Sequence, residues 1–354
     1  MSKRVLMKGN EVIAEAAVRA GCRHYFGYPI TPQTEIMHYM AKRMPEVSGT
    51  ILQAESEIAA INMVYGAAAA GARVMTTSSS PGISLKQEGF SYIAGAELPA
   101  VVVNIVRTGP GLGGILPAQG DYFQATKGGG HGDYRNIVLA PASIQELYEL
   151  TVEAFNLADR YRNLVLILGD GTLGQMMEPV TFRDEEPIDE VGKEWAVTGR
   201  QGREEHNEIT SIYINPDVME ALNNKLQKKY KEIEKKEVRV EVLQCEDAEV
   251  VIAAFGIASR ICRNVIRQAR AEGIKVGMIR PITLWPFPTE TIAAVAASEN
   301  VKALLTVELN AGQMVEDVRL AVNGCKPVEF YGRMGGNLPS QKEILNQIRA
   351  IAGR

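Results

Sequence analysis

Three kinds of side chain in the first third of the sequence could carry acid–base or anion-binding chemistry. Glu55 and Glu57 stand on the first turn of an Ala- and Gly-rich segment, 54–73, where the helix dipole favours carboxylates. Arg107 ends the apolar run VVVNIVR and precedes the glycine-rich TGPGLGG, so its guanidinium could pair bidentately with a carboxylate. Thr31, in GYPITPQTE, could cap a helix, and such a strand-to-helix turn also offers N–H groups to an anion.

Each of these residues also has a plain structural interpretation. A glutamate on a first turn supports the helix start, Thr31 caps a helix that begins at Pro32, and Arg107 bridges carbonyl groups of its own loop. The glycine-rich segment TKGGGHGD adds His131 and Asp133, which stand either on a mobile loop or on the lining of a pocket. Residue types alone leave these alternatives open.

Residues that bind transition metals are not clustered in the sequence. The four cysteines, Cys22, Cys245, Cys262 and Cys325, are isolated, and no Cys-x-x-Cys pair occurs. The four histidines are scattered as well. Zinc and iron–sulfur sites usually need closely spaced thiolates, so we expect no metal site built from this chain alone.

The elements that must position the candidate residues alternate between strands and helices up to residue 180. Short apolar runs occur at 24–30, 49–55, 73–79, 99–107, 136–142 and 163–170, each beside a helical or glycine-rich stretch. This alternation is typical of a parallel sheet covered on both faces, whose ligands lie beyond the carboxyl ends of the strands. We therefore predict an α/β domain over residues 1–180.

The rest of the chain divides in two. Residues 181–246 are polar and charged and hold one predicted helix, 216–238, which is either a solvated connector or a docking surface. From 247 to 354 the α/β alternation returns and predicts a second, smaller domain. Its predicted strands are 249–256, 275–288 and 302–310, and its predicted helices are 257–273 and 312–322.

Composition sets the remaining limits. The 354 residues carry 38 basic and 42 acidic side chains, for a formal net charge of −4. This balance gives no reason to expect nucleic-acid binding. Apolar runs are too short to cross a bilayer, and the N-terminal segment lacks the apolar core and cleavage site of a signal peptide. We expect a cytoplasmic protein that does not associate with membranes.

Four segments together resemble the α subunit of the 2-oxoacid:ferredoxin oxidoreductases. They are YPITP at 28–32, the Glu- and Ala-rich stretch 55–73, TSSSPGISLKQEG at 77–89 and NIVRTGPG at 104–111. RPITLWPFP at 280–288 resembles the second, transketolase-C-like domain of that family. The first domain would then bind the pyrimidine ring of thiamine diphosphate. The sequence is most similar to the type that acts on 3-methyl-2-oxobutanoate, and the 2-oxoglutarate type is a near relative.

The resemblance implies an activity that is shared among subunits. Members oxidatively decarboxylate a 2-oxoacid to an acyl-coenzyme A and CO2, and the electrons pass through iron–sulfur clusters to ferredoxin. This chain would supply the pyrimidine-binding half of the thiamine diphosphate site, while a β subunit binds the diphosphate and Mg²⁺. A γ subunit and a small ferredoxin-like δ subunit complete the expected complex, and the iron–sulfur clusters belong to partner subunits.

The resemblance implies roles for those residues of this sequence that match the family motifs. Glu57, nine residues before Gly66, matches the glutamate that shares a proton with the aminopyrimidine, and Glu55 is the rival if the register differs by two. Arg107 matches the arginine that binds the substrate carboxylate, and Thr31 matches the threonine that assists it. The remaining residues expected at the coenzyme are Tyr28, Pro29, Ile30 and Gly82.

Two competing hypotheses can be weighed on the sequence. The turn LGDG at 168–171 resembles the start of the magnesium–diphosphate motif of thiamine enzymes. That motif needs a further oxygen ligand from an Asn-Asn pair shortly downstream, and no such pair follows here, so Asp170 is predicted to be structural. A self-contained thiamine decarboxylase is thereby disfavoured. A non-catalytic scaffold would have no reason to retain Thr31, Glu57 and Arg107 together.

The sequence departs from the family pattern in one turn. This turn reads TSSSPG, where many relatives have Thr-Ser-Gly-Pro-Gly. We see no γ-like extension before the first domain and therefore expect the shorter, unfused type of α subunit.

Overall fold

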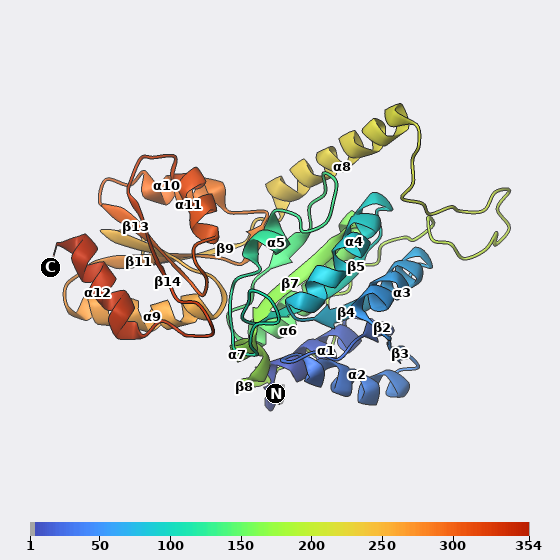
Figure 1. Cartoon of the computed structure of the whole chain (residues 1–354), viewed down its shortest axis with the longest axis horizontal. Coiled ribbons are helices and arrows are strands. Elements are labelled where there is room, and N and C mark those ends of the chain that lie inside the picture. Colours follow the sequence, from blue (N-terminus) through green and yellow to red (C-terminus); the bar gives the residue numbers. More distant parts are fainter. Residues whose placement is uncertain (1–3, 354) are drawn as a thin grey trace.

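A computed structural model describes residues 4–353 and contains two sheets of mainly parallel strands (Figure 1). The strands of the larger sheet are β2 (His24–Gly27), β3 (Thr50–Gln53), β4 (Val74–Ser78), β5 (Ala100–Val106), β6 (Ile137–Leu139), β7 (Leu164–Asp170) and β12 (Thr283–Trp285). Within the described residues their order is β12-β6-β7-β5-β4-β2-β3, and all neighbours are parallel except β12 and β6. The predicted α/β class with a parallel sheet is confirmed. Residues 1–3 and 354, which the predicted domains include, lie outside the described residues.

Helices cover both faces of the larger sheet. One face carries α3 (Glu57–Ala69) and α4 (Pro81–Gly95), and the other carries α1 (Gly9–Arg19), α2 (Thr34–Glu46) and α6 (Ile144–Tyr161) (Figure 1). Strands β4, β5 and β7 are buried along their whole length. Their Val- and Ile-rich sequences suit a central position, because both faces of each strand contact helices.

Smaller elements complete this larger unit. They are α5 (Tyr122–Thr126), α7 (Gly171–Gln175) and the antiparallel pair β1 (Arg4–Lys8) and β8 (Met177–Thr181), and the pair was not expected from the sequence. Residues 182–215 then follow without helix or strand and extend from one end of the molecule (Figure 1). None of the helices in residues 4–353 has the length and apolar character needed to span a membrane.

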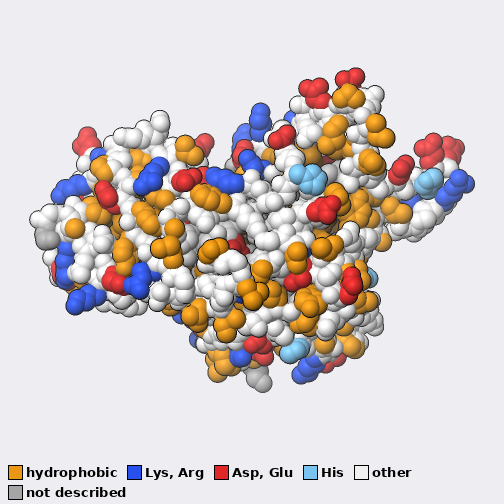
Figure 2. Space-filling view, in the orientation of Figure 1, with side chains coloured by type: hydrophobic (Ala, Val, Ile, Leu, Met, Phe, Trp, Pro, Cys, Tyr) orange, Lys and Arg blue, Asp and Glu red, His pale blue; other side chains and the backbone are white. Residues whose placement is uncertain are grey.

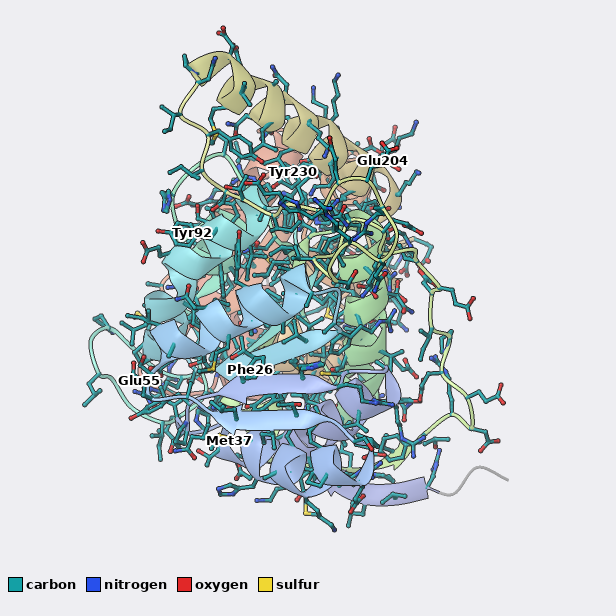
Figure 3. The ribbon with its side chains drawn as sticks, turned by 90° about the vertical axis from the view of Figure 1, so that its right-hand side faces the viewer. Phe26, Met37, Glu55, Tyr92, Glu204 and Tyr230 are labelled. Atoms are coloured by element: carbon teal, nitrogen blue, oxygen red, sulfur yellow. The ribbon has the colours of Figure 1, made fainter. Side chains whose placement is uncertain are left out.

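The charged helix α8 (Pro216–Lys236) packs onto the larger unit along one stripe. Its buried residues are Leu226, Tyr230 and Ile233, and Tyr230 lies beneath the helix (Figure 3). Lys225 and Lys229 pair with Glu97 at the end of α4. The predicted connector helix is therefore anchored to its own chain along one stripe by apolar and ionic contacts, and most of its other residues are exposed.

The smaller unit is a five-stranded sheet, in the described residues, between two pairs of helices (Figure 1). Its elements are β9 (Val240–Leu243), β10 (Val250–Ala253), α9 (Gly256–Ala271), β11 (Val276–Pro281), α10 (Thr289–Ala296), β13 (Ala303–Glu308), α11 (Met314–Val322), β14 (Val328–Gly332) and α12 (Gln341–Ala352). The strand order is β14-β13-β10-β11-β9, with β9 antiparallel to β11. Helices α9 and α12 pack together, as do α10 and α11.

The single strand predicted at 275–288 is wrong. The chain leaves the smaller sheet at Pro281 and adds β12 to the edge of the larger sheet. Polar contacts reinforce this link, because both terminal nitrogens of the buried Arg280 donate hydrogen bonds to the carboxylate of Glu146, at 2.7 and 3.0 Å. Gln119 also bridges the units, donating to the carbonyl of Phe255 at 2.9 Å and accepting from the N–H of Leu309 at 3.0 Å.

Candidate active site

The predicted functional residues gather at the carboxyl edge of the larger sheet. Thr31 follows β2, Glu57 follows β3, Gly82 follows β4 and Arg107 follows β5. These four strands are consecutive in the sheet order, so their ends meet at one edge. Ligands of parallel α/β folds bind at this edge.

Glu57 is the first residue of α3 and is buried, with 6% of its surface exposed. It does not cap the helix, because the hydroxyl of Ser56 accepts the N–H of Ala59 at 3.2 Å. A Cβ atom at Gly82 would lie 2.5 Å from Oε1 of Glu57, so only glycine allows this close approach. Glu55 instead is exposed at the outer edge of the molecule (Figure 3). Burial therefore favours Glu57 over its rival.

Two polar groups lie beside Gly82. Within the described residues, the buried hydroxyl of Ser78 has no hydrogen-bond partner, and none of the hydrogen bonds among them reaches the carboxylate of Glu57. Both groups crowd the point at which a side chain at Gly82 would begin. Leaving a buried polar group unsatisfied costs about 1–3 kcal/mol, so this arrangement fits a polar ligand.

Arg107 contacts the turn that leads into α4 through hydrogen bonds between its backbone and the hydroxyl of Ser80. Its Nη1 donates to the carbonyl of Thr31 at 3.0 Å and its Nη2 to the carbonyl of Leu112 at 3.1 Å. The guanidinium thus bridges loop carbonyls, as the structural interpretation of Arg107 predicted. Its Nε is buried and has no partner in the part of the chain that the structure describes. Two of the five guanidinium N–H groups are thus used, and the others remain for an anionic ligand.

The predicted helix cap at Thr31 is wrong. Helix α2 begins at Thr34, its N-cap is Gln33, and no side chain caps it. Thr31 contacts Arg107 through its backbone, and its own side chain is exposed at the sheet edge. The sequence suggested a cap because Thr-Pro is a common helix start, but here the turn continues for two further residues before helical geometry begins.

Residues 28–33 are held against the sheet by a buried polar chain. Gln33 donates to the carbonyl of Tyr28 and accepts the hydroxyl proton of Thr77, which also contacts the hydroxyl of Tyr25 at 2.7 Å. Burial raises the pKa of Tyr25, which therefore stays a neutral hydrogen-bonding group. Tyr28 is exposed at the mouth of the site, and Pro29 and Ile30 are half-buried beside it.

A second network, which sequence reasoning missed, holds the backbone of Arg107. Ser80 donates its N–H to Oδ1 of Asn104, and its hydroxyl receives the N–H of Arg107 at 3.1 Å. Asn104 in turn donates to Asp121 at 2.8 Å, and burial raises the pKa of that acid. Ser80 adopts a φ of +21°, which side chains rarely tolerate. The unusual TSSSPG turn was the available signal for this network.

Asp170 and the glycine-rich loop both make structural contacts within the chain. Asp170 caps α7 by accepting the N–H groups of Thr172 and Leu173 at 2.8 and 3.2 Å, and burial raises its pKa to about 6. His131 and Asp133 are exposed on a loop that contacts α4 and α8 through backbone carbonyls. Among residues 4–353, no group of three or more His, Cys, Asp or Glu side chains is placed to hold a metal ion.

Apolar side chains are exposed around the candidate site. Figure 2 shows hydrophobic atoms gathered over the face that α3 and α4 present. The site rim, as we call this set, comprises Tyr28, Leu52, Ile58, Leu85, Leu112 and Ile115, which are 36–83% exposed. Ile58 follows Glu57 in the sequence, and the carbonyl of Leu112 accepts a hydrogen bond from Arg107. An exposed apolar patch beside a polar site is typical of a protein–protein interface.

Comparison with known proteins identifies the class first. Residues 15–242 match the thiamine-diphosphate-binding region of the pyruvate flavodoxin/ferredoxin oxidoreductases, and residues 248–344 match core domain II of pyruvate:ferredoxin oxidoreductase. A split-gene transketolase shares the fold at 13% identity, with a TM-score of 0.58 over 98% of both chains. The larger unit is thus a thiamine-diphosphate-binding domain.

More similar proteins narrow the class to a family. The ketoisovalerate oxidoreductase subunit VorB of Methanothermobacter thermautotrophicus is 54% identical over 98% of both chains. The 2-oxoglutarate synthase subunit KorA of Methanothermobacter marburgensis is 36% identical over 99% of this chain and 100% of its own. This chain belongs to the 2-oxoacid:ferredoxin oxidoreductase family and is one subunit of such an enzyme, as its motifs predicted.

A solved relative agrees with this assignment. The 2-oxoglutarate:ferredoxin oxidoreductase from Magnetococcus marinus, solved with 2-oxoglutarate, coenzyme A and succinyl-CoA bound, has a TM-score of 0.87 at 28% identity. The match covers 99% of this chain but only 65% of the relative's chain. Both α/β units of the present chain are therefore found in an oxidoreductase of known structure.

Proposed function

We propose that this chain is the α subunit of a coenzyme A-dependent oxidoreductase that converts 3-methyl-2-oxobutanoate to an acyl-coenzyme A and CO2 and reduces ferredoxin. The observation that carries the proposal is a buried, unpartnered acid, Glu57, placed against a glycine at the sheet edge. The choice of substrate is supported by the higher identity to VorB, 54%, than to KorA, 36%. The KorA substrate, 2-oxoglutarate, is the alternative.

The residues present fit the pyrimidine end of thiamine diphosphate. Glu57 would hold a proton at its carboxyl group and share it with a ring nitrogen, while residues 28–31 and Gly82 would leave space for the ring. The hydroxyl of Ser78 is a donor available to the same ligand. When bound, the coenzyme would supply an acidic carbon as the nucleophile and an electron sink for the loss of CO2.

Arg107 would bind the carboxylate of the 2-oxoacid. Two of its nitrogens are held by the carbonyls of Thr31 and Leu112, so the guanidinium is fixed before substrate arrives. The guanidinium N–H groups that these carbonyls do not use can then donate to the carboxylate, and the exposed Thr31 side chain can assist. Donors placed in advance are worth more than donors that must be ordered during binding.

The remaining parts of the proposed centre come from partner subunits. Asp170 uses its carboxylate to cap α7, so we assign the diphosphate and Mg²⁺ to a β subunit. The apolar site rim is the surface on which that subunit would dock and exclude water from Glu57. The iron–sulfur clusters are assigned to the γ or the small ferredoxin-like δ subunit, because the cysteines of this chain are isolated.

The proposal is tested on the complex purified from its native host. We expect coenzyme A-dependent reduction of a viologen dye with 3-methyl-2-oxobutanoate, and slower reduction with 2-oxoglutarate. Faster turnover of 2-oxoglutarate would replace the proposed substrate by the alternative. Activity of this chain alone would contradict the division of the site between subunits.

Arg107→Ala provides the residue-level test in the same complex. Because loss of one preorganised donor typically costs about 10²–10³ in rate, we expect at least this fall in kcat/KM. Subunit composition should be unchanged, since the hydrogen bonds that the Arg107 side chain makes in the described structure go to backbone carbonyls of the same chain. A complex that assembles normally and keeps wild-type kcat and KM would refute the assigned role.

A further inference from the structure

The segment after β5 leaves Arg107 and then returns to it. We call residues 108–118 the arginine loop. At the base of this loop, the N–H of Thr108 donates to the carbonyl of Leu116 at 3.1 Å. Near its middle, the carbonyl of Leu112 accepts a hydrogen bond from Nη2 of Arg107 at 3.1 Å. This second contact is made by the guanidinium itself, so a shift of the loop also shifts the group that would bind the substrate carboxylate.

The arginine loop has little rigidity of its own. Four of its eleven residues are glycines, whose backbone loses more freedom on ordering than that of any other residue. Leu112 and Ile115 are 83% and 60% exposed, so their side chains contribute little packing on the rest of the chain. A loop of this composition keeps a defined position only where neighbouring elements support it.

The smaller unit supports the loop at Leu116. Gly336 lies between β14 and α12 and adopts a φ of +88°. A Cβ atom at this glycine would lie 2.4 Å from Cβ of Leu116 and 2.8 Å from its Cδ1. Glycine therefore allows the backbone of the smaller unit to lie directly against the residue whose carbonyl closes the base of the loop.

A second support follows the loop at Gln119, which is buried. Its side-chain amide donates to the carbonyl of Phe255 at 2.9 Å and accepts the N–H of Leu309 at 3.0 Å. Its backbone N–H donates to the carbonyl of Leu309 at 3.0 Å, and its carbonyl accepts a hydrogen bond from the side chain of Asn310 at 2.9 Å. All four of these hydrogen bonds go to the smaller unit, which α5, the next helix, also faces (Figure 1).

Holding the two units together does not by itself require a contact on this loop. Strand β12 and the pair of Arg280 with Glu146 already link the units. Gly336 and Leu116 instead meet on the segment that carries one of the hydrogen-bond acceptors of the guanidinium. Their contact is therefore placed to affect Arg107 as well as the stability of the chain.

We propose that Gly336 and Leu116 are positioning residues for substrate binding: through their contact, the smaller unit fixes the arginine loop and, with it, the guanidinium of Arg107. Neither residue touches the substrate. The inference rests on the proposed function, because it needs Arg107 to bind the carboxylate of the 2-oxoacid. It gives the smaller unit a part in substrate binding in addition to its structural role.

The first test is Gly336→Ala in the assembled complex. The new Cβ and that of Leu116 must separate from 2.4 Å to at least 3.4 Å, a shift of about 1 Å, to reach ordinary contact. Misplacement by about 1 Å can cost about 100-fold in rate, so we expect kcat/KM for 3-methyl-2-oxobutanoate to fall by about 10- to 100-fold. The affinity for thiamine diphosphate, measured by calorimetric titration, should stay near the wild-type value, because Glu57 and Gly82 lie on other segments.

The neighbouring glycine provides the matched control. Gly335 also has a positive φ, +69°, but nothing lies within 4 Å of a Cβ atom at this position. Gly335→Ala therefore introduces similar backbone strain without the contact, and its kcat/KM should stay within about twofold of wild type. Equal losses in the two variants would show that strain, and not the contact with Leu116, causes the effect, and would overturn the proposal.

Leu116→Ala tests the same contact from the other side. It removes the side chain beyond Cβ without straining the backbone, and Leu116 is 55% exposed, so this variant should assemble even if Gly336→Ala does not. We expect kcat/KM to fall by about 3- to 10-fold, because the loop is loosened rather than displaced. Leu320→Ala, at an exposed position on α11, makes the same substitution away from the loop and should leave kcat/KM unchanged.

A double variant separates this inference from the proposed function. Because Gly336 acts through Arg107, adding Gly336→Ala to Arg107→Ala should cause little further loss of kcat/KM. Losses that multiply in full would overturn the proposal. So would wild-type kcat/KM in both Gly336→Ala and Leu116→Ala, and an impaired Arg107→Ala would then leave the proposed function intact. Wild-type kcat/KM in Arg107→Ala would instead overturn the role of Arg107 in the proposed function.

Discussion

Each of the two α/β units places a buried glutamate at the start of a helix on the carboxyl side of its sheet, but the two acids are used differently. Glu308 ends β13 and has no exposed surface, and its carboxylate accepts the N–H groups of Met314 and Val315 at 2.9 and 3.0 Å. The side chain of Asn310 donates a further hydrogen bond at 2.9 Å. Glu57 is almost as buried, yet its carboxylate accepts no hydrogen bond within the described residues.

The difference shows how a structural acid can be told from one that is available for chemistry. Glu308 closes the first turn of α11 itself, and burial raises its pKa despite these donors. In α3 the neighbouring Ser56 performs the capping, so Glu57 is left free. A buried carboxylate that the protein does not satisfy is costly, and such a cost is expected where a ligand will supply the partner.

The largest expected effect in this comparison belongs to Glu57→Gln. The amide cannot hold the proton that must be shared with the coenzyme ring, so proton exchange at the thiazolium C2 should slow by about 10²–10⁴-fold in the assembled complex. The free energy of unfolding should change little, because the Glu57 carboxylate accepts no hydrogen bond that would be lost among the described residues. Exchange is followed by quenched-flow NMR in D2O. A normal exchange rate would remove Glu57 from the proposed centre.

Glu308→Gln should give the opposite result. Its amide NH2 would face backbone N–H donors, and loss of charge-assisted hydrogen bonds should lower the free energy of unfolding by about 2 kcal/mol. Urea denaturation of the isolated chain measures this change. Proton exchange in the folded complex should remain near wild type. If Glu308→Gln kept full stability but lost exchange, the structural assignment of Glu308 would be wrong.

Gly82→Ala should give the smallest of the three effects. The new Cβ would lie 2.1 Å from the hydroxyl of Ser78 and 2.5 Å from Glu57, so both groups must move. We expect at least about a tenfold loss of thiamine diphosphate affinity, about 1.4 kcal/mol, in calorimetric titration. The matched control is Gly66→Ala on α3, where nothing lies within 4 Å of the new atom. Equal affinities in the two variants would show that the close approach at Gly82 has no role in binding.

Much of this fold follows from sequence patterns that depend on local burial. The runs that became β5 and β7 are apolar throughout, and only a strand between two helical layers buries every residue. β12 was missed because three residues carry too little pattern, and their partner strand, β6, is far away in the sequence. Pairings of this kind are decided by tertiary packing rather than by local preference.

The candidate site was only partly visible in the sequence. Glu57 and Arg107 could be named from motifs, because their spacing from glycines is distinctive. Thr31 was misjudged as a cap, since capping depends on backbone angles that Thr-Pro does not determine. The network of Ser80, Asn104 and Asp121 was overlooked, because it depends on contacts between segments that are far apart in the sequence.

The three residues of β12 make the two α/β units mechanically inseparable. A protein cut before this strand would leave β6 with a bare row of N–H and C=O groups, and exposed strand edges of this kind recruit other chains. Fragments that end near residue 247 should therefore aggregate rather than behave as autonomous domains. The same tether means that a rotation of the smaller unit would pull on β6 and, through it, on β7, whose last residue caps α7 at the sheet edge.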